Sequence, residues 1–341
     1  MKISIITTVY KAEQTLSHLL DSMMAQESEE LEFFLINNGT QDRSGEICAQ
    51  YAEKDSRFHI CTLKNNIGYI AARNLGIQQC EGDYIGFCDS DDYLEPKGYD
   101  KAIEIIKATD CDFYMTAWNT VLPTMTRRHQ LPYKTGLYTG DSVHERILPQ
   151  AFGVLPGKGM LHGFAWKEII RRDIVVKNNI RFIPVLQPFE DQVFNIQVLK
   201  NVRGVYVDDY PLYNYVVSEQ SITGRMFKKD GFQRMFDRYI MLYSEKENQA
   251  DTNTESTANC NSVVNSMYEI LVNQVKYDPD YKKHISVMSE QLGSRKLRDI
   301  CVRASYGVSR YNDLIKWCIV HRLPKLILYM AYYAMKIRGK T

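Results

Sequence analysis

The first part of the chain alternates between short apolar runs and stretches in which apolar residues recur every three or four positions. β-branched apolar runs predict strands, and the helical spacing between them predicts helices. Strands are predicted at Ile3–Val9, Leu31–Ile36, Arg57–Leu63 and Tyr84–Cys88. Helices are predicted at Ala12–Met24, through Ile47 and Tyr51, and at Ala71–Gln79. This alternation is typical of a parallel, doubly wound α/β sheet.

The middle of the chain has a less regular pattern. Residues Leu122–Gly163 are rich in Gly, Pro and Thr and have poor periodicity, so we expect a long active-site loop there. Around this segment the pattern predicts helices at Tyr99–Lys107, Ile169–Val176 and Asp191–Leu199, an apolar run at Phe113–Trp118, and short strands at Val205–Val207 and Tyr213–Val217.

From Asp230 onward the spacing is mostly helical. The polar stretch Gln249–Asn261 interrupts it, and we interpret this stretch as a linker or interhelical loop. No internal repeat is present in the sequence. The pattern therefore predicts an α/β domain followed by a helical C-terminal region.

Composition narrows the class of protein. Of 341 residues, 45% are hydrophobic, and 42 Lys and Arg balance 41 Asp and Glu, which is typical of a globular protein. The net charge of +1 argues against a dedicated nucleic-acid binder. Three features favour a cytoplasmic protein. The eight cysteines form no CxxC pair, the N-terminus turns polar too soon for a signal peptide, and no apolar run reaches about 18 residues.

Three carboxylates follow the predicted strand that ends at Cys88, namely Asp89, Asp91 and Asp92. Ligands bind beyond the carboxyl ends of the strands in such sheets. Clustered carboxylates repel one another unless a cation joins them, and oxygen ligands suit Mg²⁺ or Mn²⁺. The alternative is a solvated turn with a helix cap at Asp92. The position directly after a buried strand favours the metal.

A second acidic pair, Glu190 and Asp191, begins a predicted helix. One interpretation is a favourable charge at the positive end of the helix dipole. The other is a general base that takes a proton from a hydroxyl group. The sequence alone leaves both open.

These segments, in this order, resemble family-2 glycosyltransferases with the GT-A fold. The resemblance covers about residues 1–225 and includes an Asp-x-Asp motif at Asp89–Asp91 and a later Glu-Asp motif at Glu190–Asp191. The other matching segments are Ile3–Tyr10, Leu35–Asp42, Asn66–Gly68 with Ala72–Gly76, and Ser221–Thr223. The fold that this implies is a Rossmann-like, mixed but mostly parallel sheet flanked by helices.

The resemblance also implies roles for single residues. Asp191 would be the general base, and Asp91 with Asp89 would bind Mn²⁺ or Mg²⁺. Glu190, Trp166 and Asp92 would contact the acceptor or support the site. The residues expected to bind the nucleotide sugar are Thr8, Tyr10, Asn38, Arg73, Asp89 and Ser90.

The function implied is inverting transfer of a hexosyl or N-acetylhexosaminyl group from a nucleotide diphosphate sugar, with UDP as the expected nucleotide. The acceptor would be a growing glycan or a lipid-linked glycan in surface or capsular polysaccharide biosynthesis. The catalytic domain would span residues 1–225, with a donor-binding part at about 1–95 and an acceptor-side part at about 96–225, and the helical region would span 226–341. The alternatives are a metal-dependent sugar-nucleotide nucleotidyltransferase and a non-catalytic nucleotide- or glycan-binding module.

The tail at residues 316–341 has its own chemistry. No acidic residue follows Asp313, whereas six Lys and Arg do. Between these bases lies the apolar run Leu326–Met335, which is too short to span a bilayer but suits a helix lying at a membrane interface. The alternative is a terminal helix that docks on the core or at a homodimer interface. Membrane contact would place the protein at the inner face of the cell membrane.

Overall fold

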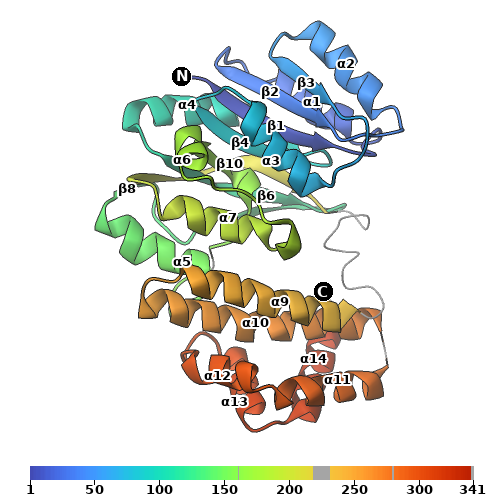
Figure 1. Cartoon of the computed structure of the whole chain (residues 1–341), viewed down its shortest axis with the longest axis vertical. Helices are drawn as coiled ribbons and strands as arrows, with labels where there is room; N and C mark the ends of the chain where they lie inside the picture. The colour runs from blue at the N-terminus through green and yellow to red at the C-terminus, as the bar shows by residue number, and fades with distance from the viewer. Residues whose placement is uncertain (160, 218–230, 279, 339–341) are drawn as a thin grey trace. The chain divides into compact units, whose positions relative to one another are not determined.

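The computed structural model describes residues 1–159, 161–217, 231–278 and 280–338 (Figure 1). These residues form two compact units. The first, which we call the sheet unit, comprises Met1–Arg146, His162–Val185 and Glu190–Val217. The second, the helical unit, comprises Ile147–Leu161, Leu186–Phe189 and the described residues after position 217. The predicted boundary at residue 225 lies outside the described residues and stays a prediction.

The sheet unit contains a ten-stranded sheet with the order β3-β2-β1-β4-β9-β6-β10-β5, to which β7 and β8 add at β6 and β10. The strands are β1 (Ile3–Val9), β2 (Leu31–Asn37), β3 (Phe58–Thr62), β4 (Tyr84–Asp89), β5 (Tyr93–Leu94), β6 (Phe113–Val121), β7 (Thr126–His129), β8 (Gly136–Thr139), β9 (Glu168–Arg171) and β10 (Gly204–Val216). Strands β1 to β4 pair in parallel, whereas β9 runs antiparallel to β4 and β6. The mixed, mostly parallel GT-A-like sheet is confirmed.

The helices of this unit connect the strands, as expected for a doubly wound sheet (Figure 1). They are α1 (Leu16–Met24), α2 (Ser44–Lys54), α3 (Tyr69–Gln79), α4 (Gly98–Thr109), the 3₁₀ helix η2 (Ala165–Lys167), α6 (Arg172–Lys177) and α7 (Glu190–Leu199). Helix α3 lies close against β1, because a Cβ on Gly76 would come within 2.4 Å of Ile6 Cγ2. This close approach holds the residues of α3 near the sheet edge.

Two expectations for the middle of the chain are wrong. Residues Leu122–Gly163 are not one long loop, because they contain β7, β8, the π-helix η1 (Val143–Ile147) and α5 (Leu148–Phe152). The segment predicted as a helix at Ile169–Val176 begins as strand β9. Strand β9 is buried between two neighbours, so its apolar run carries no period-2 alternation that would distinguish it from a helix.

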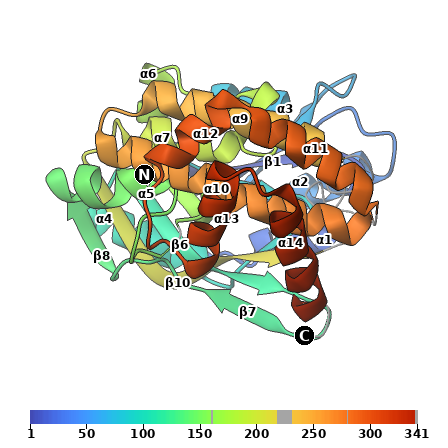
Figure 2. The same cartoon turned by 90° about the horizontal axis from the view of Figure 1, so that it is seen from below.

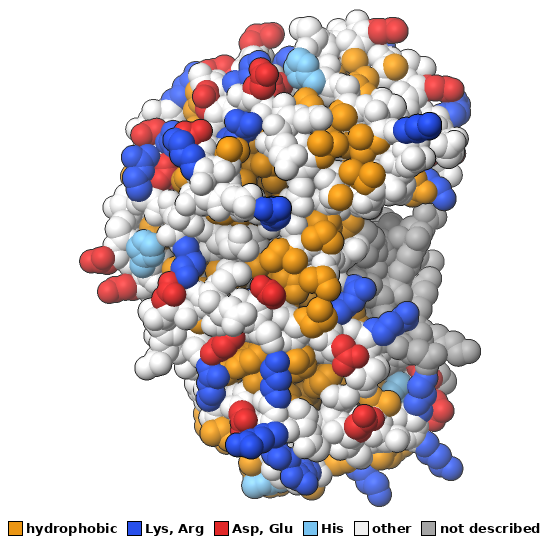
Figure 3. All heavy atoms as spheres, viewed as in Figure 1, with side chains coloured by type: hydrophobic (Ala, Val, Ile, Leu, Met, Phe, Trp, Pro, Cys, Tyr) orange, Lys and Arg blue, Asp and Glu red, His pale blue; other side chains and the backbone are white. Residues whose placement is uncertain are grey.

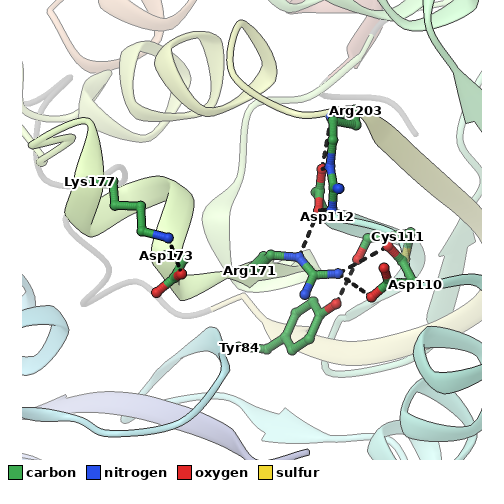
Figure 4. Close-up of polar contacts among 8 residues, drawn as sticks. All are labelled: Tyr84, Asp110, Cys111, Asp112, Arg171, Asp173, Lys177 and Arg203. Atoms are coloured by element: carbon green, nitrogen blue, oxygen red, sulfur yellow. Dashed lines mark hydrogen bonds and ion pairs between the residues drawn. The ribbon is translucent and has the colours of Figure 1, made fainter.

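A cluster of charged side chains ties β9 to the starts of β6 and β10 (Figure 4). Asp112 is buried, and its carboxylate accepts hydrogen bonds from Arg171 Nε at 2.7 Å and from Arg203 Nη2 at 2.9 Å. Arg171 also pairs with Asp110 and lies over the ring of Tyr84. These contacts fix the edge opposite to the one where the acidic motif ends β4.

The helical unit is built from α5, the 3₁₀ helix η3 (Pro184–Leu186, of which Leu186 belongs to this unit), α9 (Gly231–Gln249), α10 (Asn253–Tyr277), α11 (Tyr281–Gly293), α12 (Arg295–Arg303), α13 (Arg310–Val320) and α14 (Pro324–Arg338). Helix α5 packs on α10, where a Cβ on Gly153 would meet the carbonyl oxygen of Ala258 at 2.2 Å. The side chain of Asn261 donates to the carbonyl of Val154 at 2.8 Å. This packing explains why residues 147–161 lie with the helices.

The predicted linker at Gln249–Asn261 is mostly helix, because α9 ends at Gln249 and α10 begins at Asn253. Thr252 caps α10 by accepting from the backbone N–H of Glu255, and the Glu255 carboxylate accepts from the backbone N–H of Thr252. This reciprocal capping box starts a helix within a polar sequence. None of the helices that the structure describes is long and apolar enough to cross a membrane.

Candidate active site

Two acidic segments that lie far apart in the sequence meet at one arginine. Asp89 ends β4, Arg73 lies in α3, and Asp191 is the second residue of α7. Arg73 Nη2 donates to Asp89 Oδ1 at 2.8 Å, and its Nη1 donates to Asp191 Oδ1 at 2.9 Å. Asp191 Oδ2 accepts from the backbone N–H of Ala165 at 3.1 Å. Three of the predicted site residues therefore form one cluster.

The guanidinium of Arg73 is buried among aromatic rings, with its central carbon 5.0 Å from the ring centre of Phe182 and 5.4 Å from that of Phe87. The neighbouring Asn74 side chain donates to the carbonyl of Phe182 and accepts from its N–H, both at 2.9 Å. The segment that carries Phe182 is thus fixed to α3. This packing gives the arginine a single position between the two carboxylates.

The cluster carries one positive charge against two negative charges. Burial raises the pKa of Asp191, and although Arg73 opposes this rise, Asp89 adds repulsion because it shares the same guanidinium. Ion pairs held in a buried site keep most of their strength because water does not screen them. Asp191 is therefore an oriented carboxylate whose proton affinity is higher than that of an ordinary aspartate.

Asp92 supports the site through hydrogen bonds with β10. Its carboxylate is buried, accepts from the Tyr213 hydroxyl at 2.7 Å and accepts from the backbone N–H of Val216 at 2.7 Å. The same hydroxyl accepts from the backbone N–H of Asp89 at 2.9 Å. Burial, together with the charges of Asp89 and Asp91, raises the pKa of Asp92 well above its usual range. Asp92 thus links the end of β4 to β10.

Asp91 lies at the surface of the site and makes no ion pair with the described residues. Although its side chain is exposed, the surrounding protein desolvates it, and this effect and the charge of Asp89 raise its pKa to about 6. A divalent cation would relieve this repulsion, so Asp91 and Asp89 have the donor chemistry of a Mn²⁺ or Mg²⁺ site. The described residues contain no group of three His, Cys, Asp or Glu side chains placed to hold an ion. Any further ligands would come from substrate or water.

The residues predicted to bind the nucleotide lie at the same sheet edge. Thr8 pairs in register with Asp89 in β4, and Tyr10 follows β1 with an exposed ring. The carbonyl of Ser90 accepts from the Thr15 hydroxyl at 2.9 Å. The structure places these residues together at one edge of the sheet.

Asn38 is buried, and its side chain contacts the loop before α3. Its Nδ2 donates to Asn66 Oδ1 at 3.2 Å, and its Oδ1 accepts from the backbone N–H of Ile67 at 3.0 Å. Asn66 Oδ1 also accepts from the N–H of Gly68, the residue that caps α3 with φ of 84°. An aspartate at position 38 would lack the donor that Asn66 requires, which gives a physical reason for an amide here.

Trp166 is buried in a stack of rings rather than exposed. Its ring is 4.5 Å from that of Tyr213 and 4.8 Å from that of Phe164, with interplanar angles of 14° and 10°. His162 stacks on the outer side of Phe164 at 5.4 Å, and burial lowers its pKa to about 4. These contacts pack His162 against the aromatic stack and give Trp166 a supporting position.

Sequence analysis missed several parts of this site. The N–H of Ala165 is a backbone group and has no sequence signal, and Tyr213 enters the sequence-based expectations only as the first residue of a predicted strand. Lys167 and Glu168 are fully buried and form an ion pair at 2.7 Å, which their polar character did not suggest. The Ser221–Thr223 motif lies outside the described residues.

Comparison with known proteins agrees with this geometry. Residues 4–154 match the sequence model of glycosyl transferase family 2, and that segment contains both Arg73 and the Asp89–Asp91 motif. The segment 4–154 belongs to this family and supports glycosyltransferase activity. The match favours a glycosyltransferase over the nucleotidyltransferase alternative.

Three curated members or relatives illustrate the similarity. The uncharacterised glycosyltransferase EpsJ of Bacillus subtilis is 27% identical over 252 residues, which cover 71% of this chain and 70% of EpsJ. The putative glycosyltransferase EpsH of the same organism is 29% identical over 248 residues, covering 71% and 67%. The putative teichuronic acid biosynthesis glycosyltransferase TuaG of B. subtilis is 28% identical over 117 residues, covering 34% and 46%.

Solved structures show the same fold over almost the whole chain. TarS 1–349 of S. aureus in complex with UDP-GlcNAc gives a TM-score of 0.67 with 16% identity, covering 98% of this chain and 92% of TarS 1–349. The mannosyltransferase PcManGT of Pyrobaculum calidifontis, in complex with GDP-Man and Mn²⁺, gives a TM-score of 0.53 with 10% identity, covering 98% and 86%. At these identities the similarity is one of fold, and it includes a helical C-terminal region.

Proposed function

We propose that this family 2 glycosyltransferase moves a sugar, with inversion, from a UDP-sugar to a hydroxyl of a growing or lipid-linked glycan in cell-surface polysaccharide biosynthesis. The observation that carries the proposal is the position of Arg73 between the two acidic motifs. Arg73 donates to Asp89 of the Asp-x-Asp motif at 2.8 Å and to Asp191 of the Glu-Asp motif at 2.9 Å. A site for direct transfer between two substrates requires these two acidic motifs at one place.

The donor proposal rests on the sheet edge and on the relatives. Thr8 lies near the carboxyl end of β1, and Tyr10 and Asn38 directly follow β1 and β2, at the edge where such folds bind nucleotides. The TarS structure contains UDP-GlcNAc, which favours UDP and a hexosyl or N-acetylhexosaminyl group. The relationship to TuaG favours a polysaccharide as product. Arg73 and Ser90 complete the predicted donor contacts.

A divalent cation fits the donor side of the site. Asp91, with its pKa raised to about 6 beside Asp89, would hold Mn²⁺ or Mg²⁺ together with Asp89. Such an ion supplies neutralisation of the charge that develops on the leaving diphosphate. The mannosyltransferase of similar fold contains Mn²⁺ together with its nucleotide sugar.

Asp191 is the proposed general base. The Arg73 guanidinium and the N–H of Ala165 fix its orientation, and burial raises its pKa toward the range where it accepts a proton efficiently. When Asp191 takes the proton of the acceptor hydroxyl, the charge of Arg73 remains balanced by Asp89. The deprotonated hydroxyl then attacks the anomeric carbon from the face opposite the diphosphate, which inverts the configuration.

Asp191→Asn tests this assignment. We expect donor binding, measured as thermal stabilisation by UDP-sugars with Mn²⁺, to stay within about twofold, because Asn keeps an acceptor for Ala165. We expect transfer, or slow donor hydrolysis measured as UDP release, to fall at least about 10³-fold. Asp173→Asn, which removes an exposed carboxylate paired with Lys177, is the matched control and should leave both unchanged.

The same assay separates the remaining alternative. A panel of nucleotide sugars that stabilise the protein without any turnover would indicate a binding module and would contradict catalysis. Full activity of Asp191→Asn would contradict the base assignment alone, because transfer would then proceed without this carboxylate. Turnover that requires Mn²⁺ or Mg²⁺ and is lost in Asp91→Asn would support the proposed metal site.

A further inference from the structure

Helix α14 presents an unusual outer face. Its inner residues Ile327, Leu328 and Ala331 are fully buried against the rest of the helical unit. The outer face carries Tyr329 and Tyr333, which are 63% and 58% exposed. A surface helix normally directs charged residues outward. Among the positions of α14 whose side chains the structure describes, the exposed ones hold five apolar or aromatic residues and two lysines, namely Leu326, Tyr329, Tyr332, Tyr333, Ile337, Lys325 and Lys336.

Helix α13 extends this face. The two helices contact each other within the helical unit, and Figure 2 shows them side by side. Leu314 and Trp317 lie one turn apart on the exposed side of α13, where Trp317 is 44% exposed, while Ile315 and Ile319 on the other side are fully buried. We call the exposed residues Leu314, Trp317, Leu326, Tyr329, Tyr333 and Ile337 the α13–α14 face.

The segment of the chain that carries this face is mostly basic. Residues 294–341 contain eleven Lys and Arg but only two acidic residues, although the whole chain has a net charge of only +1. One of the two, Asp313, accepts hydrogen bonds from the N–H of Gly307. Figure 3 shows several Lys and Arg side chains over the helical unit, together with some Asp and Glu side chains. The surroundings of the α13–α14 face therefore attract anions.

We propose that the α13–α14 face binds the surface of an anionic lipid bilayer. Tyr and Trp favour the water–hydrocarbon interface, because one end of each ring system is apolar and the other forms hydrogen bonds. Leu326 and Ile337 would enter the boundary between the headgroups and the acyl chains. The neighbouring Lys325 and Lys336 would contact lipid phosphates. No helix that the structure describes can span a membrane, so the contact is peripheral.

Charge complementarity favours lipid over other occupants. A second copy would place the same face opposite itself and bring Lys325 and Lys336 close to identical lysines without acidic partners. The phosphates of a nucleic acid would pair with Lys325 and Lys336 but would leave Leu326 and Ile337 without apolar contacts. An anionic bilayer satisfies both kinds of side chain.

Vesicle sedimentation tests the proposal with the full chain. We expect binding to vesicles of phosphatidylcholine with 30% phosphatidylglycerol, little binding to phosphatidylcholine alone, and loss of binding in high salt. Tyr329→Ser/Tyr333→Ser should weaken binding about tenfold or more. Leu137→Ser/Val185→Ser is the control, because it removes two exposed apolar side chains of the sheet unit and should bind normally.

Trp317 offers an independent readout. Of the three tryptophans, Trp118 and Trp166 are buried, so only Trp317 can meet lipid. Brominated phosphatidylglycerol vesicles should quench the fluorescence of the protein, and Trp317→Phe should abolish this quenching while the secondary structure, measured by circular dichroism, stays unchanged.

Absence of binding to anionic vesicles, or equal binding by Tyr329→Ser/Tyr333→Ser when both proteins are folded, would overturn the proposal. A dimer in light scattering that this double variant dissociates, without vesicle binding, would identify a second copy as the occupant and would also overturn it. Because these experiments use neither donor nor acceptor, their outcome is separate from that of the Asp191→Asn test.

Discussion

Arg73 donates to Asp191 at 2.9 Å across 118 residues of sequence. The other end of the same guanidinium holds Asp89, the first residue of the acidic motif that ends β4. Because both carboxylates share the Arg73 guanidinium, a change in the charge of one alters the electrostatic stabilisation of the other. The predicted donor and acceptor halves of the site are electrostatically a single unit, which leads to the first prediction.

Arg73→Lys should lower glycosyl transfer by at least about 10²-fold although it keeps the charge. A lysine ammonium cannot donate to two carboxylates with the fork geometry of a guanidinium, and it loses the flat contacts with Phe87 and Phe182. One partly buried carboxylate loses its hydrogen-bonded partner, so the free energy of unfolding should also fall by about 1–3 kcal/mol. Activity and denaturant unfolding measure the two effects.

Arg57→Lys provides the control for a purely structural loss. Arg57 pairs with Asp55 at 2.7 Å and lies over the ring of Phe33, but none of its contacts involves a predicted site residue. This variant should lose stability and keep its transfer rate under conditions where it is folded. If both variants lost activity only in proportion to unfolding, Arg73 would be no more than a packing residue.

Tyr213→Phe should destabilise the sheet unit by about 1–3 kcal/mol. Its hydroxyl donates to buried Asp92 and accepts from the N–H of Asp89, so Phe would leave both groups without this partner. We also expect weaker stabilisation by Mn²⁺ and UDP-sugar, because the backbone of Asp89 loses a fixed contact. Thermal unfolding with and without these ligands measures both effects.

Tyr215→Phe is the matched change on the same strand. Tyr215 also stacks on Trp166, at 5.9 Å, but its hydroxyl makes no hydrogen bond with the residues that the structure describes. Its free energy of unfolding should change by less than about 0.5 kcal/mol. Equal losses in the two variants would show that the hydroxyl of Tyr213 contributes little.

Sequence reasoning found the carboxylates but not their connection. Asp89, Asp91 and Asp191 could be predicted because a strand end and a helix start have clear sequence signals and because the family motifs occur in order. The role of Arg73 as a bridge could not be predicted from spacing, because its position in α3 carries no information about a partner 118 residues away. The N–H of Ala165 belongs to the backbone, which no sequence pattern marks.

The errors in the fold have similar local causes. The sequence predicts two short strands where β10 is continuous, because Asp208, Asp209 and Pro211 interrupt the apolar pattern. The structure accommodates this stretch with register shifts in the pairing with β6. The polar composition after Gln249 predicts a linker, although Thr252 and Glu255 have the spacing of a capping box that starts α10. In both cases local polar residues predict a break, whereas the packing of the folded chain continues the strand or starts the helix.

Glu168→Gln should flatten the dependence of stability on pH between about 4.5 and 7. Burial raises the pKa of Glu168 to about 7, although Lys167 opposes the rise. Between the two pKa values the folded chain binds more protons than the unfolded chain, so stability falls as pH rises. Gln keeps an acceptor for Lys167 and for Asn195 Nδ2 but does not titrate. An unchanged slope in urea titrations would contradict this, and Glu104→Gln on the exposed side of α4 is the control.

Lys246→Met should remove a pH dependence of opposite sign in the helical unit. Lys246 is buried in α9, and its Nζ lies 3.4 Å from Ser262 Oγ. Burial lowers its pKa to about 7 from an ordinary 10.5. Between these values the unfolded chain binds more protons, so the stability of the wild-type protein should rise with pH from about 7 to 10.5.

Methionine fills a similar volume without a charge, so Lys246→Met should be more stable than the wild type at pH 7, by about 1–3 kcal/mol, and nearly equal to it near pH 10. Urea unfolding followed by circular dichroism at several pH values measures the difference. Lys282→Met, at an exposed position of α11, should leave the pH profile unchanged. A Lys246→Met variant that kept the rise of stability with pH would show that another group causes it.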